Sequence, residues 1–203
     1  MDILGVFPIP VGVQKLDRPF TKEEEECFNL ISQKTFNNYG NLTSCDTNVL
    51  DRPELENLKK FCLDSVNLFV KAYNPPKNFL SFYITQSWIN YTKQNQSHHS
   101  HYHPNSFISG VFYLNANIKH DKIYFVNSNP IQPMIKYTAE SFTQFNSEDW
   151  FVPVETSTLL LFPSSLKHFV AINNQPYQRV SLSFNTFVEG LLGEKTTLTE
   201  LVL

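Results

Sequence analysis

The stretch SHHSHYHPNSFISGVFYLN, residues 97–115, joins four of the protein's six histidines to an apolar run that is typical of a β-strand. His101 and His103 stand two residues apart, and side chains at this spacing point to the same side of an extended backbone. Imidazole is a common ligand of iron, zinc and copper. The pattern by itself fits either a transition-metal site with a third ligand from elsewhere or an exposed loop with idle histidines, and residues later in the chain decide between them.

The strand pattern continues on both sides of this stretch. Proline, asparagine and serine clusters separate many of the candidate strands, and no helical periodicity lies between them, which disfavours a parallel βαβ architecture. We therefore predict a mainly β fold, a double-stranded β-helix or jelly roll. The predicted strands are residues 79–91, 107–115, 122–126, 150–154, 158–162, 168–172 and 179–188.

Helices are predicted only in the N-terminal part, where they are expected to pack on one sheet. Thr21 and Glu24 have the spacing of a capping box and start a first helix. Asp51 is expected to cap a second helix, because apolar side chains within residues 55–73 recur at helical spacing. Residues 37–49 are rich in Asn, Thr and Ser and are expected to form a loop.

The length of 203 residues suits one domain. We expect a helical support over residues 1–78, a jelly-roll core over residues 79–190 and a tail over residues 191–203. The tail could be a strand or a short helix. The apolar segment 5–13, interrupted by prolines, suits an edge strand or an extended lead-in.

Charge and composition exclude several classes of protein. A net charge of −3 without a run of Lys and Arg argues against a nucleic-acid surface or an anionic-membrane patch. No apolar run is long enough to span a bilayer, and the N-terminus lacks the basic region of a signal peptide. Cys27, Cys45 and Cys62 form no CxxC pair, which disfavours a disulfide framework or a zinc ribbon. We expect a protein of the reducing cytoplasm, with a homodimer as one option for its assembly.

Two further residues extend the predicted site. Arg179 and Ser181 share one face of their strand, opposite apolar neighbours, and in a jelly roll covered by helices this face can line an interior pocket. A buried guanidinium needs an anionic partner, which a ligand carboxylate could supply. His168 follows a buried strand and a turn and stands eleven residues before Arg179. It is therefore the candidate for the third metal ligand.

The order of these motifs resembles the Fe(II)- and 2-oxoglutarate-dependent dioxygenases, most closely their prolyl-hydroxylase-like branch. Within that branch, the chain looks like a family of 2-oxoglutarate/Fe(II) oxygenases found in marine bacteria and tailed phages. The resemblance covers nearly the whole chain. The motifs that carry it are FPIP at 7–10, SWIN at 87–90, HYHPNS at 101–106, SGVFYL at 109–114, LFPSSLKH at 161–168 and RVSLSFN at 179–185.

The resemblance implies a site that binds Fe(II) and 2-oxoglutarate. The implied iron ligands are His101, His103 and His168, and the implied 2-oxoglutarate contacts are Arg179, Ser181, Tyr113 and Asn90. Arg179 would pair with the distal carboxylate. Tyr91 is an alternative to Asn90, but adjacent strand residues face opposite sides, and Asn90 is preferred.

One departure from the family pattern concerns the second ligand, which is usually Asp or Glu, whereas this chain has His103 there. A carboxylate suits Fe(II), and three neutral imidazoles leave the metal more electrophilic while still leaving three coordination positions open. His99, also two residues from His101, is a less favoured alternative ligand. His98 and His120 have no assigned role, and Asp121, the nearest candidate acid, is expected to be a turn residue.

The resemblance therefore predicts an enzyme that hydroxylates an unidentified peptide or small molecule with O2 and 2-oxoglutarate. Substrate is expected to enter by the loops between Ile118 and Glu148, whose aromatic residues are Tyr124, Tyr137, Phe142 and Phe145. Two alternatives stay open. One is a non-catalytic metal-binding jelly roll, and the other is a zinc hydrolase that uses the same three histidines.

Overall fold

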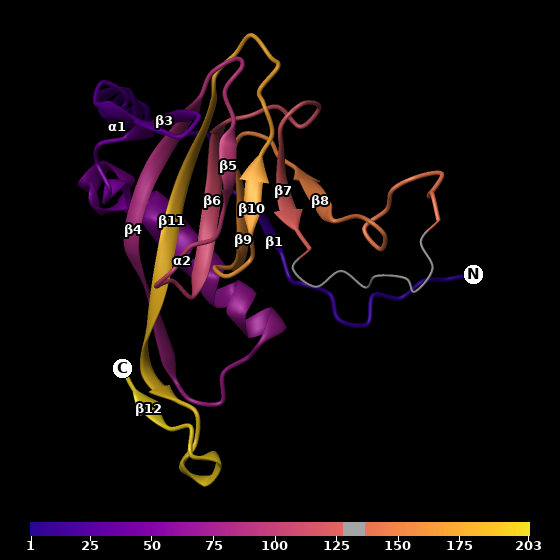
Figure 1. The fold of residues 1–203 in the computed structure, drawn as a ribbon. Coiled ribbons are helices and arrows are strands. Elements are labelled where there is room, and N and C mark those ends of the chain that lie inside the picture. The colour runs from indigo at the N-terminus through magenta and orange to yellow at the C-terminus, as the bar shows by residue number, and fades with distance from the viewer. Residues whose placement is uncertain (128–136) are drawn as a thin grey trace.

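The computed structural model describes residues 1–127 and 137–203 and contains two antiparallel sheets (Figure 1). The larger sheet has eight strands, in the order β1 (Gly12–Lys15), β9 (Thr158–Pro163), β6 (Ile108–Asn115), β11 (Arg179–Leu192), β4 (Leu80–Thr92), β3 (Asn41–Ser44) and β2 (Thr35–Asn38), with β12 (Leu201–Val202) paired to the end of β11. The smaller sheet has the order β5 (His98–His101), β10 (His168–Val170), β7 (Lys122–Val126) and β8 (Asp149–Pro153). This is the predicted jelly roll.

The seven predicted strands are all present, as β4, β6, β7, β8, β9, β10 and β11. The largest displacement is at the end of β11, which reaches Leu192 rather than residue 188. Strand β1 pairs with β9 at the edge of the larger sheet, as the proline-interrupted segment before it suggests. The tail contains a short 3-10 turn, η3 (Lys195–Thr197), followed by β12.

The expected loop at residues 37–49 is wrong, because much of this region belongs to a β-hairpin formed by β2 and β3. Tyr39 and Gly40 both have positive φ angles, 43° and 135°, as a tight two-residue hairpin turn requires. A Cβ atom on Gly40 would lie 2.9 Å from the carbonyl oxygen of Ser97. Glycine is therefore needed here both for its backbone conformation and for the close approach of Ser97.

The first helix, α1 (Lys22–Ser32), begins with the predicted capping box. Thr21 Oγ1 accepts a hydrogen bond from the Glu24 backbone N–H at 3.2 Å, and the Glu24 carboxylate accepts one from the Thr21 N–H at 2.9 Å. Arg18 donates two further bonds to the same carboxylate, at 2.8 and 2.6 Å. The buried Glu24 thus ties the chain before the helix to its first turn.

The predicted start of the second helix is wrong. Asp51 ends a 3-10 turn, η1 (Val49–Asp51), and a second turn, η2 (Pro53–Leu55), precedes the helix α2 (Glu56–Tyr73). The cause is Pro53, since a proline pushes the residue before it out of the α conformation. Arg52 accordingly has an extended backbone with ψ of 134°.

Two hydrophobic cores lie on opposite faces of the larger sheet. In the first, α1 and α2 pack on the outer face, where β11 contributes Leu182 and Phe184. The second core lies between the two sheets and includes Tyr113, Phe125 and Phe162. The alternation of β11 therefore places its apolar side chains against the helices and turns its polar side chains toward the smaller sheet.

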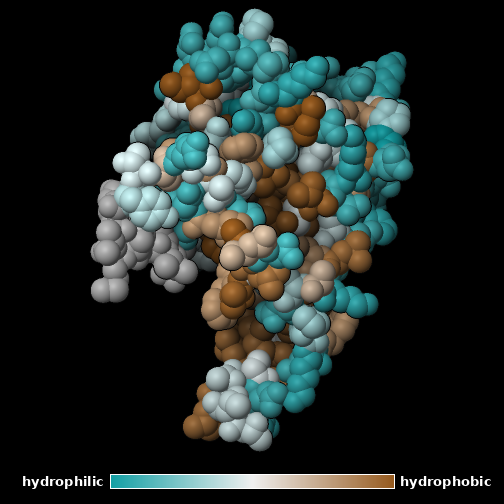
Figure 2. All heavy atoms as spheres, turned by 90° about the vertical axis from the view of Figure 1, so that its right-hand side faces the viewer, coloured by the Kyte–Doolittle hydropathy of each residue, from teal (hydrophilic) through white to brown (hydrophobic). Residues whose placement is uncertain are grey.

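The surface mixes polar and apolar regions. Figure 2 shows the side of the molecule that lies on the right in Figure 1, with hydrophilic residues over its upper part and hydrophobic residues in its middle and lower part. Within the described residues, no helix combines the length and the apolar character that crossing a bilayer requires.

Candidate metal centre

The three predicted histidine ligands meet at one end of the smaller sheet. His101 ends β5 and stands opposite His168, the first residue of β10, in the antiparallel register. His103 lies just beyond β5, where its backbone N–H donates to the Ser164 carbonyl at 2.9 Å. The ligand atoms of the three side chains all lie within 4.8 Å of one another. We call these three residues the inner group.

The distances within the inner group suit a shared ion. The Nε2 atoms of His103 and His168 are 3.3 Å apart. Two imidazole nitrogens bound to one ion at about 2.1 Å, at tetrahedral or octahedral angles, stand roughly 3.0–3.4 Å apart. Trp88 stacks on His103 with ring centroids 5.7 Å apart, which holds that ring from the side of β4.

Backbone carbonyls fix the tautomers of two of these rings. Nδ1 of His101 lies 2.8 Å from the His99 carbonyl oxygen, and Nδ1 of His168 lies 3.0 Å from that of Leu166. A carbonyl can only accept, so each Nδ1 carries the proton and each Nε2 keeps its lone pair. This is the arrangement in which a histidine binds a metal through Nε2.

Burial keeps the inner group uncharged. Burial, reinforced by the neighbouring imidazoles, lowers the pKa of His103 to about 4 and that of His168 to about 3. Burial also lowers the pKa of His101. The rings are therefore neutral near pH 7, as metal binding requires.

The buried guanidinium of Arg179 has a partner within the chain. Its Nη1 donates to Asp121 Oδ1 at 3.3 Å, and the Tyr177 hydroxyl donates to Asp121 Oδ2 at 2.7 Å. Asp121 also accepts the Asn117 backbone N–H at 2.8 Å, so it is the expected turn residue. No local sequence pattern indicates that Asp121 pairs with Arg179, because the two residues are far apart in the chain.

Arg179 retains an unused donor. Its Nη2 is buried and has no hydrogen-bond partner within the described part of the chain. Arg179 and the inner group line the same cavity, of about 760 Å³. An unpaired buried donor is costly, and a carboxylate is its strongest partner. Three neutral imidazoles and a free guanidinium nitrogen in one cavity therefore fit a metal ion together with an organic acid.

The other predicted 2-oxoglutarate contacts, Ser181, Tyr113 and Asn90, line the same cavity. Asn90 is held by its neighbours, since its Oδ1 accepts from Thr43 at 2.9 Å and its Nδ2 donates to Ser183 at 3.1 Å. Burial raises the pKa of Tyr113, so its hydroxyl stays protonated and can donate.

The alternative residue, Tyr91, belongs to the hydrophobic core on the helix side of the larger sheet. Its hydroxyl is buried there and has no hydrogen-bond partner among the residues that the structure describes, and burial raises its pKa to about 12. The alternation of β4 thus gives Asn90 and Tyr91 opposite surroundings.

Residues 86–185 match the model of a family described as "Putative 2OG-Fe(II) oxygenase". The chain belongs to the 2OG-Fe(II) oxygenases. The family uses Fe(II) and 2-oxoglutarate, so both are cofactors of this oxygenase. No curated protein matches the sequence significantly.

Several solved structures have a fold similar to that of this chain. A prolyl-4-hydroxylase from Pseudomonas putida has 13% identity and a TM-score of 0.55, with 87% of this chain and 92% of that chain covered. HygX from Streptomyces hygroscopicus, solved with nickel, 2-oxoglutarate and hygromycin B, has 11% identity and a TM-score of 0.58, with 88% and 82% covered. A 2OG-Fe(II) oxygenase family oxidoreductase from Burkholderia pseudomallei has 12% identity and a TM-score of 0.53, with 81% and 78% covered. At sequence identities of 11–13%, these similarities show that the fold is shared.

Sequence reasoning missed one wall of the oxygenase cavity. The hairpin β2–β3 and the segment after it contribute Phe36, Asn38, Thr43 and Thr47. These residues were expected in or beside a loop, because the hairpin is rich in Asn and Thr. The available signal was the sequence NYGN, residues 38–41, a glycine-containing turn between two short alternating segments.

The expected substrate entrance does not coincide with the cavity of the described residues. Tyr124, Tyr137, Phe142 and Phe145 are absent from its lining. Tyr124 lies in β7 instead and stacks on Phe169 of β10, with ring centroids 5.0 Å apart. Residues 128–136, also part of that expected entrance, lie outside the described chain.

Proposed function

We propose that this oxygenase is a hydroxylase in which His101, His103 and His168 hold Fe(II) and Arg179 binds the distal carboxylate of 2-oxoglutarate. The observation that carries the proposal is the unpartnered, buried Nη2 of Arg179 in the same cavity as three converging neutral imidazoles. Either feature alone has a structural explanation. Together they supply what the two cofactors of this family need.

Each proposed contact has a defined chemical task. When bound, Fe(II) and 2-oxoglutarate supply the oxidation, in which O2 is consumed, 2-oxoglutarate is decarboxylated to succinate, and a substrate C–H bond becomes C–OH. The imidazoles fix the position of the metal, while Arg179, Ser181 and Tyr113 orient the diacid by hydrogen bonds. Asn90 is proposed as a further contact, prepositioned by its bonds to Thr43 and Ser183.

The primary substrate is proposed to be a peptide or a small molecule. Beyond the inner group and Arg179, aromatic and uncharged polar side chains contribute to the cavity lining, including Phe36, Asn38, Thr47, Gln86 and Trp88. This lining suits a substrate that buries apolar surface and makes a few neutral hydrogen bonds. Among the described residues, the zinc-hydrolase alternative lacks a free carboxylate base at this cavity, since the buried Asp121 is already bound by Arg179 and Tyr177.

The test is an anaerobic titration with Fe(II) and 2-oxoglutarate. We expect a visible charge-transfer band for the wild type and its loss in His168→Ala. Arg179→Lys should require at least about tenfold more 2-oxoglutarate, because lysine lacks the planar fork of arginine. His120→Ala, an exposed histidine outside the cavity, is the matched control.

Two results would contradict the proposal. One is a wild-type protein that binds Fe(II) but gives no band with 2-oxoglutarate, which would favour the non-catalytic metal-binding class. The other is an unchanged band in His168→Ala. Succinate release in air, measured with and without proline-containing peptides, then tests turnover and the peptide substrate class.

The predictions about cellular location, domain division and assembly remain proposals. A reducing cytoplasm is consistent with three free cysteines, of which Cys27 and Cys62 are buried. The division into an N-terminal support, a jelly-roll core and a tail can be tested by limited proteolysis. A homodimer can be tested by sedimentation at several protein concentrations.

A further inference from the structure

Strand β5 contains one residue more than its partner can pair. In the register with β10, His101 stands opposite His168 and His98 stands opposite Val170. Two residues of β5, His99 and Ser100, therefore face the single residue between them on β10, which is a β-bulge. In a regular strand, residues three apart point to opposite faces. The bulge instead turns the side chains of His98 and His101 to the same side.

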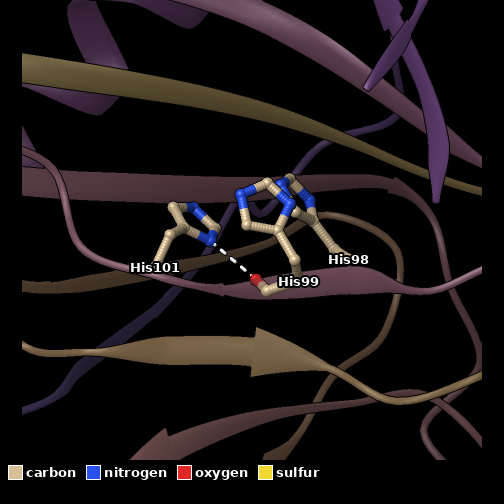
Figure 3. A group of neighbouring side chains, drawn as sticks. All are labelled: His98, His99 and His101. Carbon is tan, nitrogen blue, oxygen red and sulfur yellow. Dashed lines mark hydrogen bonds between the residues drawn. The ribbon is translucent and has the colours of Figure 1, made fainter. Parts of the chain in front are cut away.

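The bulge gathers a second group of imidazoles, which Figure 3 shows on one side of β5. The rings of His98 and His101 stack with centroids 4.7 Å apart, and the ring of His99 lies 5.2 and 5.0 Å from them. The ligand atoms of His98, His99 and His101 lie within 4.8 Å of one another. We call these residues the outer group.

The two groups differ in their access to solvent. His99 is exposed, His98 and His101 are half-buried, and His103 and His168 are buried. His98 and His99 also line a second, shallower depression between β5 and the end of β10. An ion arriving from solvent thus meets the outer group first.

Asn41 gives an independent sign that His98 can take the metal-binding tautomer. Its amide nitrogen lies 3.4 Å from His98 Nδ1, while its buried Oδ1 has no hydrogen-bond partner among residues 1–127 and 137–203. Amide nitrogen and oxygen positions are interchangeable by rotation of the side chain. After that rotation, Oδ1 of Asn41 accepts a hydrogen bond from the Nδ1–H of His98, and Nε2 of His98 is left with a free lone pair.

We propose that His98, His99 and His101 form a second, outer position for a divalent first-row metal ion, which competes with the inner position for His101. Competition follows from the hydrogen bond between His101 Nδ1 and the His99 carbonyl, drawn as a dashed line in Figure 3. That bond leaves only Nε2 of His101 for a metal. One ion at a time can therefore use the two groups.

The outer position binds an ion from solvent before that ion moves to the inner group. An ion held by His98, His99 and His101 already has one ligand of the inner group and reaches the other two by exchanging His98 and His99 for His103 and His168. The inner group is the stronger site at equilibrium, because two of its rings are buried and two of its three tautomers are fixed by backbone carbonyls.

The test removes the inner position and asks whether the outer one still binds Co(II). His168→Gln and His103→Ala each destroy the inner group and leave the outer group intact. Two variants are used so that the test still works if one of them fails to fold. We expect each to bind one Co(II) with a weaker Kd than the wild type. Adding His99→Ala should then raise that Kd by at least about tenfold, whereas adding the exposed control His120→Ala should leave it unchanged.

The wild-type background supplies the second half of the test. His99→Ala alone should leave the equilibrium Kd for Co(II) within about twofold of the wild-type value. His99 supports the inner group only through its backbone carbonyl, which alanine keeps. It should also slow Co(II) uptake in stopped-flow absorbance. The proposal is overturned if both inner-group variants bind no Co(II) while the wild type does, or if His99→Ala leaves their Kd unchanged. A wild type that binds no Co(II) would contradict both groups, and with them the proposed function.

Discussion

Asp121 carries three interactions in a buried position. It receives hydrogen bonds from a turn N–H, from the Tyr177 hydroxyl and from Arg179, and the residue is 2% exposed. The carboxylate neutralises a guanidinium that would otherwise be buried alone. Since it occupies only Nη1 of Arg179, it holds the side chain in place while Nη2 stays available.

We expect Asp121→Asn to lower the free energy of unfolding by about 3 kcal/mol, because a buried charge loses its partner. Urea unfolding measures this change. Saturating 2-oxoglutarate should raise the melting temperature of the variant more than that of the wild type, since the ligand becomes the anionic partner of Arg179. Glu155→Gln, which breaks the exposed ion pair with Lys15, should cost less than about 1 kcal/mol. Equal costs for both variants would contradict this view of Asp121.

At the scale of single residues, the sequence could reveal only those features of the site that depend on local spacing. The histidines at 101 and 103 and the polar face of Arg179 and Ser181 follow from alternation along a strand. The contact between Asp121 and Arg179 joins distant parts of the chain and leaves no local pattern. The role inferred for His98 depends on a bulge that alternation alone cannot reveal.

At the scale of single elements, the central strands were predictable because they are apolar, β-branched or aromatic and bounded by turn residues. The hairpin β2–β3 was missed because its sequence is polar, and it is specified by its turn and by pairing with β4. The start of α2 was misplaced because proline overrode the apparent cap at Asp51.

Close packing across β6 and β11 leads to a prediction for Gly110. A Cβ atom there would lie 2.2 Å from Cζ of Phe184, in the core beneath α2. We expect Gly110→Ala to lower the free energy of unfolding by about 1–3 kcal/mol or more, because the added methyl group overpacks the core. Adding Phe184→Leu should recover part of this loss, so chemical denaturation should show the two changes to be non-additive. Gly5→Ala, with no atom within 4 Å, is the control, and additive costs would contradict the packing argument.

The capping box of α1 leads to a pH prediction. Burial acts to raise the pKa of Glu24, but hydrogen bonds from Arg18 and the Thr21 N–H outweigh it and hold the pKa below its usual value. The charged carboxylate therefore stabilises the fold above about pH 4.5, and this contribution is lost as the pH falls through the lowered folded-state pKa. Glu24→Gln should lower the free energy of unfolding by about 1–2 kcal/mol at pH 7 and by less at pH 3.

Urea unfolding at the two pH values measures this difference. Glu23→Gln is the matched control, since Glu23 is an exposed acid in the same helical turn. A cost for Glu24→Gln that did not shrink in acid would rule out the charged interaction as its source.

At the scale of the whole molecule, the two cores divide the tasks of the fold. The helix-side core stabilises the larger sheet, and the space between the sheets holds both a smaller core and the cavity. The cavity brings several neutral histidines out of water. This burial makes the stability of the metal-free protein depend on pH.

We expect the metal-free protein to lose stability as the pH falls from 6.5 toward 4. The folded-state pKa values of His103 and His168 are about 4 and about 3, below the ordinary value of 6.5, so the unfolded chain takes up protons first. Each ring then contributes a slope of about 1.4 kcal/mol per pH unit in this window. Urea unfolding of chelator-treated protein measures the slope, which His168→Gln should reduce by one ring's share. An unchanged slope in that variant would contradict the prediction.

The extra residue in β5 means that insertions and deletions, as well as substitutions, can change which metals this protein handles. Removing Ser100 would restore even pairing with β10, bring His99 opposite Phe169 and direct the His99 side chain away from His98 and His101. A homologue one residue shorter at this edge could then keep every histidine and still have a different set of ligands. Alignments of such sequences therefore need to place gaps by strand register before their histidines are equated.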